Sequence, residues 1–187
     1  MSFLLQLEPE GIGTADVESM ASFFSRLAAL HCVSTYQLGN RLREKTGIRG
    51  FGNAGKARCS GRNSLLANGY GVASTAVLGW LSAGLDNAEL SPLTFKIFEH
   101  VLPKSGAGIL RQHRAWCPDC VLEFRREGKP DHEKLHWASV HTTRCPIHQR
   151  ALEFQCPKCR SKPAWYSVKG GIMDCPHCDA PLVDENV

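Results

Sequence analysis

The chain reads Cys117-Pro118-Asp119-Cys120, and the same short pattern returns as Cys145-Pro146-Ile147-His148, Cys156-Pro157-Lys158-Cys159 and Cys175-Pro176-His177-Cys178. Each copy places a proline after the first cysteine and a second cysteine or a histidine three positions after it. Two ligands at this spacing on a tight turn can reach one tetrahedral ion, and proline fixes φ in that turn. Four such pairs predict two zinc sites.

Sequential pairing predicts a Cys₃His site and a Cys₄ site. The first contains Cys117, Cys120, Cys145 and His148, and the second contains Cys156, Cys159, Cys175 and Cys178. Fifteen residues separate the two pairs of the Cys₄ set, which is a zinc-ribbon spacing, and twenty-four separate those of the Cys₃His set. Only seven residues lie between His148 and Cys156, which favours sequential pairing. An interleaved arrangement, as in cross-braced modules, stays open.

Disulfides and free buried thiols are the alternatives to zinc. Disulfides belong to oxidising compartments, whereas residues 1–25 contain no Lys or Arg and four acidic residues, which is not the pattern of a secretory signal. Each predicted site has four ligands and lacks a neighbouring glutamate placed to act as a general base. We therefore expect two structural zinc ions per chain and no catalytic one.

Composition indicates a globular chain of one or two small domains, with 187 residues and 43% hydrophobic content. No apolar run approaches the ~18 residues that a membrane span requires, so we expect a cytoplasmic protein. The net charge is −4 over residues 1–25, +8 over 26–114 and zero over 115–187. A basic region of this kind is typical of proteins that bind nucleic acid.

Helical periodicity covers the N-terminal half. Asp16 is expected to cap a helix with an apolar stripe through Leu27, and Ser34 to begin a second helix that ends at Gly47. Two further helices are expected, one over 74–85 and one that begins at Ser91-Pro92. The inner face of the second is expected to consist of Leu93, Ile97, Phe98 and Val101. The short turn between the first two helices predicts a helix-turn-helix-like pair.

The expected fold has three parts. Residues 1–108 form an α-helical domain with helix-turn-helix-like helices, residues 109–152 a first zinc module and residues 153–187 a second, ribbon-like one. Within the zinc modules we expect strands over 109–116 and 137–141 and a short helix over 121–126. The three tryptophans near the turns, Trp116, Trp137 and Trp165, are interpreted as small cores in preference to base-stacking surfaces.

A basic run follows the second predicted helix. It consists of Arg41, Arg43, Lys45, Arg49, Lys56, Arg58 and Arg62. We expect these side chains to contact nucleic-acid phosphates without reading bases, and an ordinary solvated face is the alternative. Within this run, Gly50 to Lys56 matches the first seven positions of a phosphate-binding loop, but Ala57 stands where magnesium needs a hydroxyl, so no ATP site is predicted.

Two motifs together resemble those of the TniQ family of transposon target-selection proteins. The first is Glu18-Ser19-Met20-Ala21-Ser22-Phe23-Phe24-Ser25-Arg26-Leu27-Ala28, which is similar to the family signature ESLxSWLxRLA, with Phe23 where an indole is common. The second is Trp116 with the Cys-Pro pairs that follow it, through Cys159. The chain ends at Val187, soon after the second zinc site, and in this it is similar to the short members found with CRISPR-associated transposons.

The resemblance implies a non-catalytic adaptor in the prokaryotic cytoplasm, associated with the nucleoid. Such an adaptor connects target DNA, or a CRISPR effector with its guide RNA, to an AAA+ ATPase of the TnsC/TniB type. A zinc-containing helix-turn-helix regulator of transcription is the second hypothesis. An enzyme such as a zinc-stabilised nuclease is the third, with Asp131-His132 as its only candidate pair, and no acidic triad suggests a transposase.

Metal analysis tests the site assignment directly. We expect about two zinc ions per purified chain, and Cys156→Ser to unfold the C-terminal module more than the helices, because metal binding supplies on the order of 10 kcal/mol of folding free energy per site. Elemental analysis and circular dichroism measure the two effects. A folded, gently purified protein without zinc would refute the assignment.

Overall fold

The computed structural model describes residues 3–48, 68–85, 89–102, 108–165 and 170–184. Four α-helices are described, α1 (Met20–Leu30), α2 (Thr35–Thr46), α4 (Val72–Gly84) and α5 (Pro118–Arg126). Three 3₁₀ turns are also described: η1 (Ser91–Leu93) and η2 (Phe95–Phe98) lie between α4 and α5, and η3 (Leu135–Ala138) follows α5. Among the described residues, β-structure is limited to isolated bridges, and none of the helices could cross a membrane.

Local sequence explains where the first helices begin and end. Ser19 caps α1 by accepting a hydrogen bond from Ser22 N, and Ser34 caps α2 in a reciprocal capping box with Gln37. Gly47 ends α2 in the left-handed conformation, with φ of 68°, as the sequence predicted. The prediction for Asp16 was wrong: its carboxylate lies 2.9 Å from Lys134 Nζ instead of capping α1.

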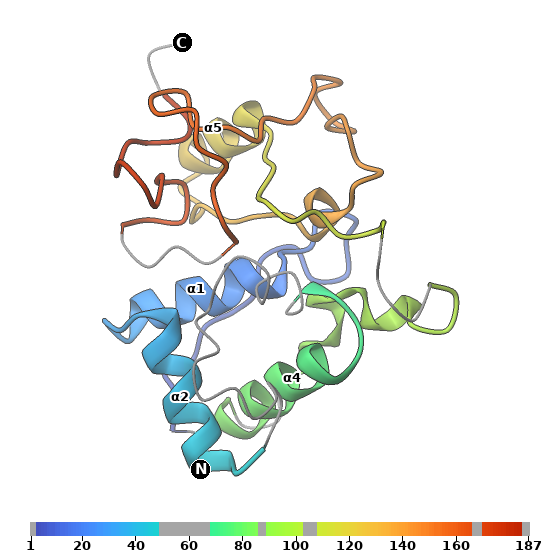
Figure 1. Cartoon of the computed structure of the whole chain (residues 1–187), viewed down its shortest axis with the longest axis vertical. Helices are drawn as coiled ribbons and strands as arrows, with labels where there is room; N and C mark the ends of the chain where they lie inside the picture. The colour runs from blue at the N-terminus through green and yellow to red at the C-terminus, as the bar shows by residue number, and fades with distance from the viewer. Residues whose placement is uncertain (1–2, 49–67, 86–88, 103–107, 166–169, 185–187) are drawn as a thin grey trace.

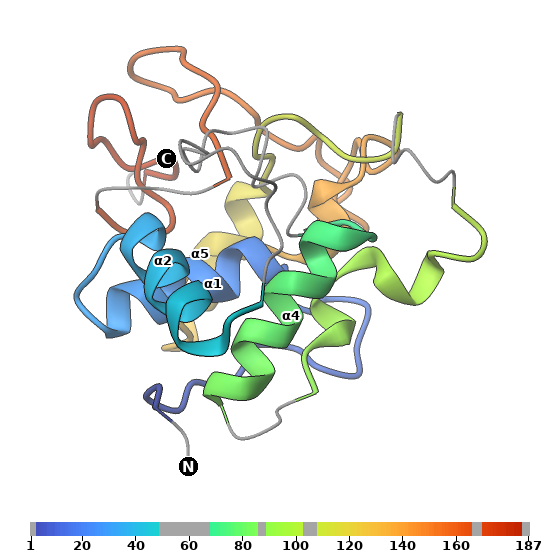
Figure 2. The same ribbon diagram turned by 60° about the horizontal axis from the view of Figure 1, so that its bottom comes forward.

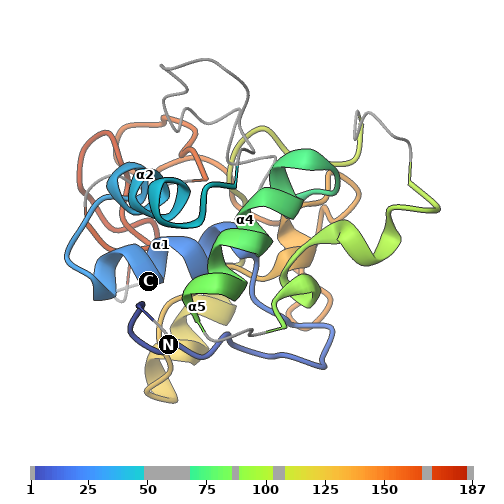
Figure 3. The same cartoon turned by 90° about the horizontal axis from the view of Figure 1, so that it is seen from below.

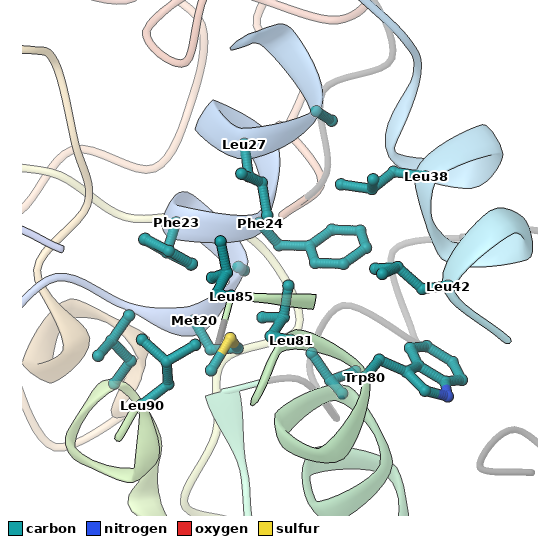
Figure 4. Close-up of a cluster of buried hydrophobic side chains, with 14 of the residues drawn as sticks. Met20, Phe23, Phe24, Leu27, Leu38, Leu42, Trp80, Leu81, Leu85 and Leu90 are labelled. Carbon is teal, nitrogen blue, oxygen red and sulfur yellow. The ribbon is translucent and has the colours of Figure 1, made fainter. Parts of the chain in front are cut away.

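One hydrophobic cluster joins α1, α2 and α4, which Figure 2 shows side by side. The cluster includes Met20, Phe23, Phe24, Leu27, Leu38, Leu42, Trp80 and Leu81, several of which point toward one another in Figure 4. It extends to Ala138 and Trp165, which lie beyond residue 108. The division into three domains therefore stays a prediction.

A second cluster lies among the segments that follow residue 114, above the helices in Figure 1 and behind α1 and α2 in Figure 3. Trp116 and Trp137 are fully buried there, which confirms that they are core residues of the metal-binding half. Trp165 is buried too, but in the first cluster with the helices, so the expectation that it forms the core of its own zinc module was wrong. Five cysteines of the Cys-Pro pairs belong to this cluster, together with apolar side chains such as Phe124, Leu152 and Met173.

The helix expected after Ser91-Pro92 is replaced by η1 and η2. Thr94 separates the two turns because its backbone is extended and its side chain bonds to both, donating to Ser91 O and accepting from Lys96 N. The inner face expected for this segment was also wrong beyond Leu93. Ile97, Phe98 and Val101 are exposed by 59%, 45% and 78%.

The two expected strands are not formed either. Residues 109–116 contain a turn and a bend and change hydrogen-bond partners along their length: Arg111 N donates to Ala138 O, Arg114 N to Pro163 O and Trp116 N to Glu153 O. No ladder can grow when each partner comes from a different segment. Residues 137–141 begin in η3 instead of a strand, whereas the helix expected over 121–126 is confirmed as part of α5.

A buried polar seam joins α1 to the second half of the chain. Ser19 N donates to Glu133 O and Leu135 N to Val17 O, both at 2.7 Å, and Glu133 N donates to Ser22 Oγ at 3.0 Å. The carboxylate of Glu18 is fully buried next to these backbone hydrogen bonds. It accepts hydrogen bonds from Ser22 Oγ and Arg26 Nη1, both at 2.6 Å.

The seam continues into a buried ion pair. Arg114, 1% exposed, pairs with Glu133, and its guanidinium also donates to Ile172 O and lies 3.8 Å from Met173 Sδ. Burial raises the pKa of Glu133, while Arg114 opposes that rise. One arginine therefore ties residues 133 and 172–173 to each other beside the second hydrophobic cluster.

Arg114→Met tests this ion pair. We expect a loss of about 3–5 kcal/mol of unfolding free energy, because the variant leaves a buried carboxylate without its cation. Urea unfolding in zinc-containing buffer measures it, and Arg114→Met combined with Glu133→Gln should recover part of the loss.

The exposed pair of Arg150 and Asp119 provides the control. Arg150→Met should cost less than ~1 kcal/mol. An Arg114→Met variant as stable as this control would contradict the role given to the buried pair.

Candidate metal centres

The structure groups the eight predicted ligands in sequential order. Cys117, Cys120, Cys145 and His148 form one cluster, and Cys156, Cys159, Cys175 and Cys178 form the other. The ligand atoms of each cluster lie within 4.8 Å of one another. Of the two pairings that the sequence left open, the sequential one is therefore the one observed.

The interatomic distances fit tetrahedral coordination. Cys120 Sγ lies 3.6 Å from Cys145 Sγ, and the three sulfurs of the first centre lie 3.4–3.5 Å from His148 Nδ1. In the second centre Cys156 Sγ lies 3.7 Å from Cys178 Sγ, and Cys159 Sγ 3.6 Å from Cys175 Sγ. A tetrahedral zinc site has edges of about 3.5–3.8 Å, calculated from Zn–S and Zn–N bonds of ~2.3 and ~2.0 Å. Disulfide sulfurs would lie ~2.05 Å apart.

Three of the four Cys-Pro pairs fold into the same knuckle. In each, the residue after the second ligand donates its N–H to the carbonyl of the first cysteine, from Gln149 to Cys145, Arg160 to Cys156 and Asp179 to Cys175, at 2.9–3.0 Å. These three residues all have positive φ, between 54° and 60°. The repeated sequence pattern thus produces a repeated backbone that points both ligands of a knuckle toward one centre.

The remaining pair, Cys117 and Cys120, begins a helix. Cys117 is the N-cap of α5, and Cys120 is the third residue of the helix. Pro118 is its first residue, a position where the missing N–H of proline costs no hydrogen bond. The positive end of the helix dipole therefore lies beside these two sulfurs. The first centre is built from one knuckle and one helix N-terminus, and the second from two knuckles.

Glu123 is a residue of the first centre that the sequence analysis missed. Its carboxylate lies 3.0 Å from His148 Nε2, while His148 Nδ1 faces the sulfurs. Although burial lowers the pKa of His148, the hydrogen bonds with Glu123 and Cys145 raise it to about 9. The signal was present in the sequence, since Glu123 follows Cys120 by three positions and so lies on the same face of α5.

Ser161 is the corresponding neighbour of the second centre. Its hydroxyl lies 3.1 Å from Cys159 Sγ and 3.4 Å from Cys175 Sγ. The two centres differ in exposure, because the three cysteines of the first are buried, whereas Cys159 of the second is exposed.

Other candidate residues have different places. His177 is exposed, as expected for a residue between two ligands, and His136 lies 3.7 Å from Asp16 instead of joining the first centre. The Asp131-His132 pair of the nuclease hypothesis has structural partners: Asp131 pairs with Arg125, and His132 stacks on Phe124 at 4.0 Å between ring centroids.

The predicted nucleic-acid contacts fall into two groups. Arg41, Arg43 and Lys45 are exposed on α2. The other four, Arg49, Lys56, Arg58 and Arg62, lie outside the described residues, as does the Gly50 to Lys56 segment.

The fold and the two clusters define a class: a helical protein with two Cys/His centres that could each hold a metal ion. The donor set of seven thiols and one imidazole fits zinc. The model of one family, TniQ, matches residues 9–152, and the chain belongs to the TniQ family. The match includes α1 and the first centre and ends before Cys156, so it does not include the second centre. A comparison with curated proteins gave no match.

Glu123→Gln tests the outer contact of the first centre. We expect metal affinity at that centre to fall by about 10–100-fold, because a carboxylate that hydrogen-bonds a ligating imidazole orients it and increases its basicity. Competition with a chromogenic chelator resolves the two centres. Glu127→Gln, at the end of the same helix, is the matched control and should change neither affinity. An equal loss at both centres would contradict the assignment.

Proposed function

We propose that this protein is a non-catalytic targeting adaptor for transposition. It connects target DNA, or a CRISPR effector with its guide RNA, to an AAA+ ATPase of the TnsC/TniB type. The family match over residues 9–152 is the observation that carries the proposal, because it ties the chain to transposition. The two metal centres support it as zinc-stabilised scaffolding, since each cluster already offers four ligands and leaves no position for substrate.

The structure gives the family-like segment 18–28 a physical role. Ser22 accepts a hydrogen bond from Glu133 N, and the backbone of Glu18 pairs with that of Lys134, while Arg26 bonds to the Glu18 carboxylate. We infer that these three residues help to hold the helices against the metal-binding half. An adaptor needs such rigidity if its two ends bind different partners.

Nucleic-acid contact is assigned to α2. Arg41, Arg43 and Lys45 are exposed on this helix, which follows α1 after a short turn, and we propose that the two helices act as a helix-turn-helix-like pair. The proposed contacts are to phosphates, so they position the protein without selecting a sequence. A site of action on nucleoid DNA in the prokaryotic cytoplasm follows from this proposal.

Co-sedimentation with the neighbouring AAA+ ATPase tests the adaptor function. The ATPase is assembled on DNA with a non-hydrolysable nucleotide, and we expect the protein to pellet with this assembly and to stay in the supernatant with DNA alone at physiological salt. Tight, sequence-dependent binding to DNA alone, unaffected by the ATPase, would support the transcription-regulator hypothesis instead.

Charge variants on α2 test whether this helix contributes to DNA binding. Arg41→Gln with Arg43→Gln should weaken DNA binding uniformly across sequences and reduce the salt dependence by about two ionic contacts. Arg126→Gln on α5 is a control of the same kind. Equal effects of the α2 variant and the control would show that α2 has no particular role.

A further inference from the structure

Ion pairing distributes the charge of the second half of the chain unevenly. Residues 115–187 carry equal numbers of acidic and basic residues. Several acids are engaged in salt bridges, namely Asp119 with Arg150, Glu127 with Lys129, Asp131 with Arg125 and Glu133 with Arg114. Although the net charge of residues 115–187 is zero, basic side chains without an acidic partner can still make part of their surface positive.

Three cations of this half gather on one knuckle of the second centre. Lys158 lies between Cys156 and Cys159, Arg160 follows Cys159, and Lys162 comes two positions later. All three side chains are exposed, and none forms a salt bridge with any residue in the described ranges. Three cations without an acidic partner within five residues create a local positive potential, which the zero net charge of residues 115–187 does not reveal.

An exposed aromatic ring lies beside one of these cations and four residues before Lys158 in the chain. Phe154 is 45% exposed, and Lys162 Nζ lies 5.5 Å from its ring centroid. A large aromatic side chain at the surface costs solvation free energy, and its neighbours Leu152 and Cys156 are buried in the second cluster while the ring is not. Phe154 therefore does not serve that core.

The backbone that carries the cations is fixed. Cys156 N donates to Ser161 O at 2.9 Å, and Arg160 N donates to Cys156 O at 3.0 Å, so both ends of the knuckle are closed. Metal binding by Cys156 and Cys159 would hold the same turn from inside. Cations on a pre-organised turn lose less conformational entropy on binding than cations on a free loop.

We propose that residues 154–162 form a binding site for single-stranded nucleic acid, called here the 154–162 knuckle. Lys158 and Arg160 bind successive phosphates, and the Phe154 ring stacks on an unpaired base, with Lys162 beside it. Proteins that bind single-stranded nucleic acid commonly combine cationic side chains, which contact the phosphates, with an exposed aromatic ring, on which any base can stack. The site lies beyond the segment matched by the family model and is separate from α2.

The cations also have a simpler possible role. A divalent ion held by four thiolates leaves the second centre with a formal charge of −2, and Lys158 and Arg160 would partly neutralise it. This role predicts that removing them weakens metal binding and leaves nucleic-acid binding unchanged. The proposed site predicts the opposite result, so the two roles are separated by measuring both quantities on the same variants.

The experiment uses the full chain in its zinc-loaded form, without the ATPase, so that its outcome is independent of the adaptor function. Fluorescence anisotropy measures affinity for a labelled polypyrimidine strand, as DNA and as RNA, over a range of salt concentrations. The variant Lys158→Gln with Arg160→Gln should bind about 25-fold more weakly at about 0.1 M salt, and the slope of log K against log salt should fall by about 1.4, as expected for two lost phosphate contacts. Zinc content should not change.

Phe154→Ala tests the stacking part separately. It should weaken binding about tenfold and leave the salt slope unchanged, because a base–aromatic contact releases no counterions. Duplex DNA should compete poorly with the single strand, since its bases are not available for stacking. Stronger binding of RNA or of DNA in the first experiment identifies which strand the site prefers.

Arg126→Gln with Lys129→Gln removes the same charge from α5 and the turn that follows it, and provides the matched control. It should leave affinity and slope close to those of the parent protein. Equal losses in the control and the knuckle variant, an unchanged affinity in the knuckle variant, or loss of zinc without loss of binding would each overturn the proposal.

Discussion

Two sets of four sulfur and nitrogen atoms, with neighbouring atoms 3.4–3.7 Å apart, form the constraint on which the second half of this structure depends. Thiolates at that separation repel one another unless a cation lies between them, so the folded arrangement and metal binding stabilise each other. In the described part of this half, β-structure is limited to isolated bridges, and a hydrophobic cluster that includes Trp116, Phe124 and Trp137 packs around the cysteines. Each knuckle is therefore held both by this cluster and by its ligand centre.

The seam between α1 and residues 133–135 extends this dependence to the helices. Arg114 pairs with Glu133 and donates to Ile172 O, three residues before Cys175, while Glu133 N bonds to Ser22 on α1. A continuous set of contacts therefore runs from the second centre to the first helix. The segment that resembles the family signature takes part in it through Glu18, Ser22 and Arg26, which explains in physical terms why these polar residues stand on a largely buried helix.

Two exposed basic surfaces are the places where we propose that this protein contacts nucleic acid. The exposed cations of α2 belong to the helical half, and the 154–162 knuckle belongs to the metal half. A chain with a nucleic-acid contact at each end can orient a strand relative to a protein partner, which a single contact cannot do. Nucleic-acid binding at both surfaces would support the proposed function, in which target DNA or guide RNA is presented to a protein partner.

The sequence by itself determined the eight residues that gather in the two Cys/His clusters, the presence of α1, α2, α4 and α5, and the family, because each is encoded by short-range patterns: a spacing of three on a turn, a cap or a periodic apolar stripe. It did not determine which pairs share a metal, which extended segments form ladders, that Thr94 would divide a helix, or that Asp16 would bind Lys134 instead of capping α1. It also placed the positive charge in the middle of the chain and missed the cations left unpaired at residues 158–162. These features depend on which distant residues meet, and only the tertiary structure decides that, because contact energies between segments far apart in the chain outweigh local preference.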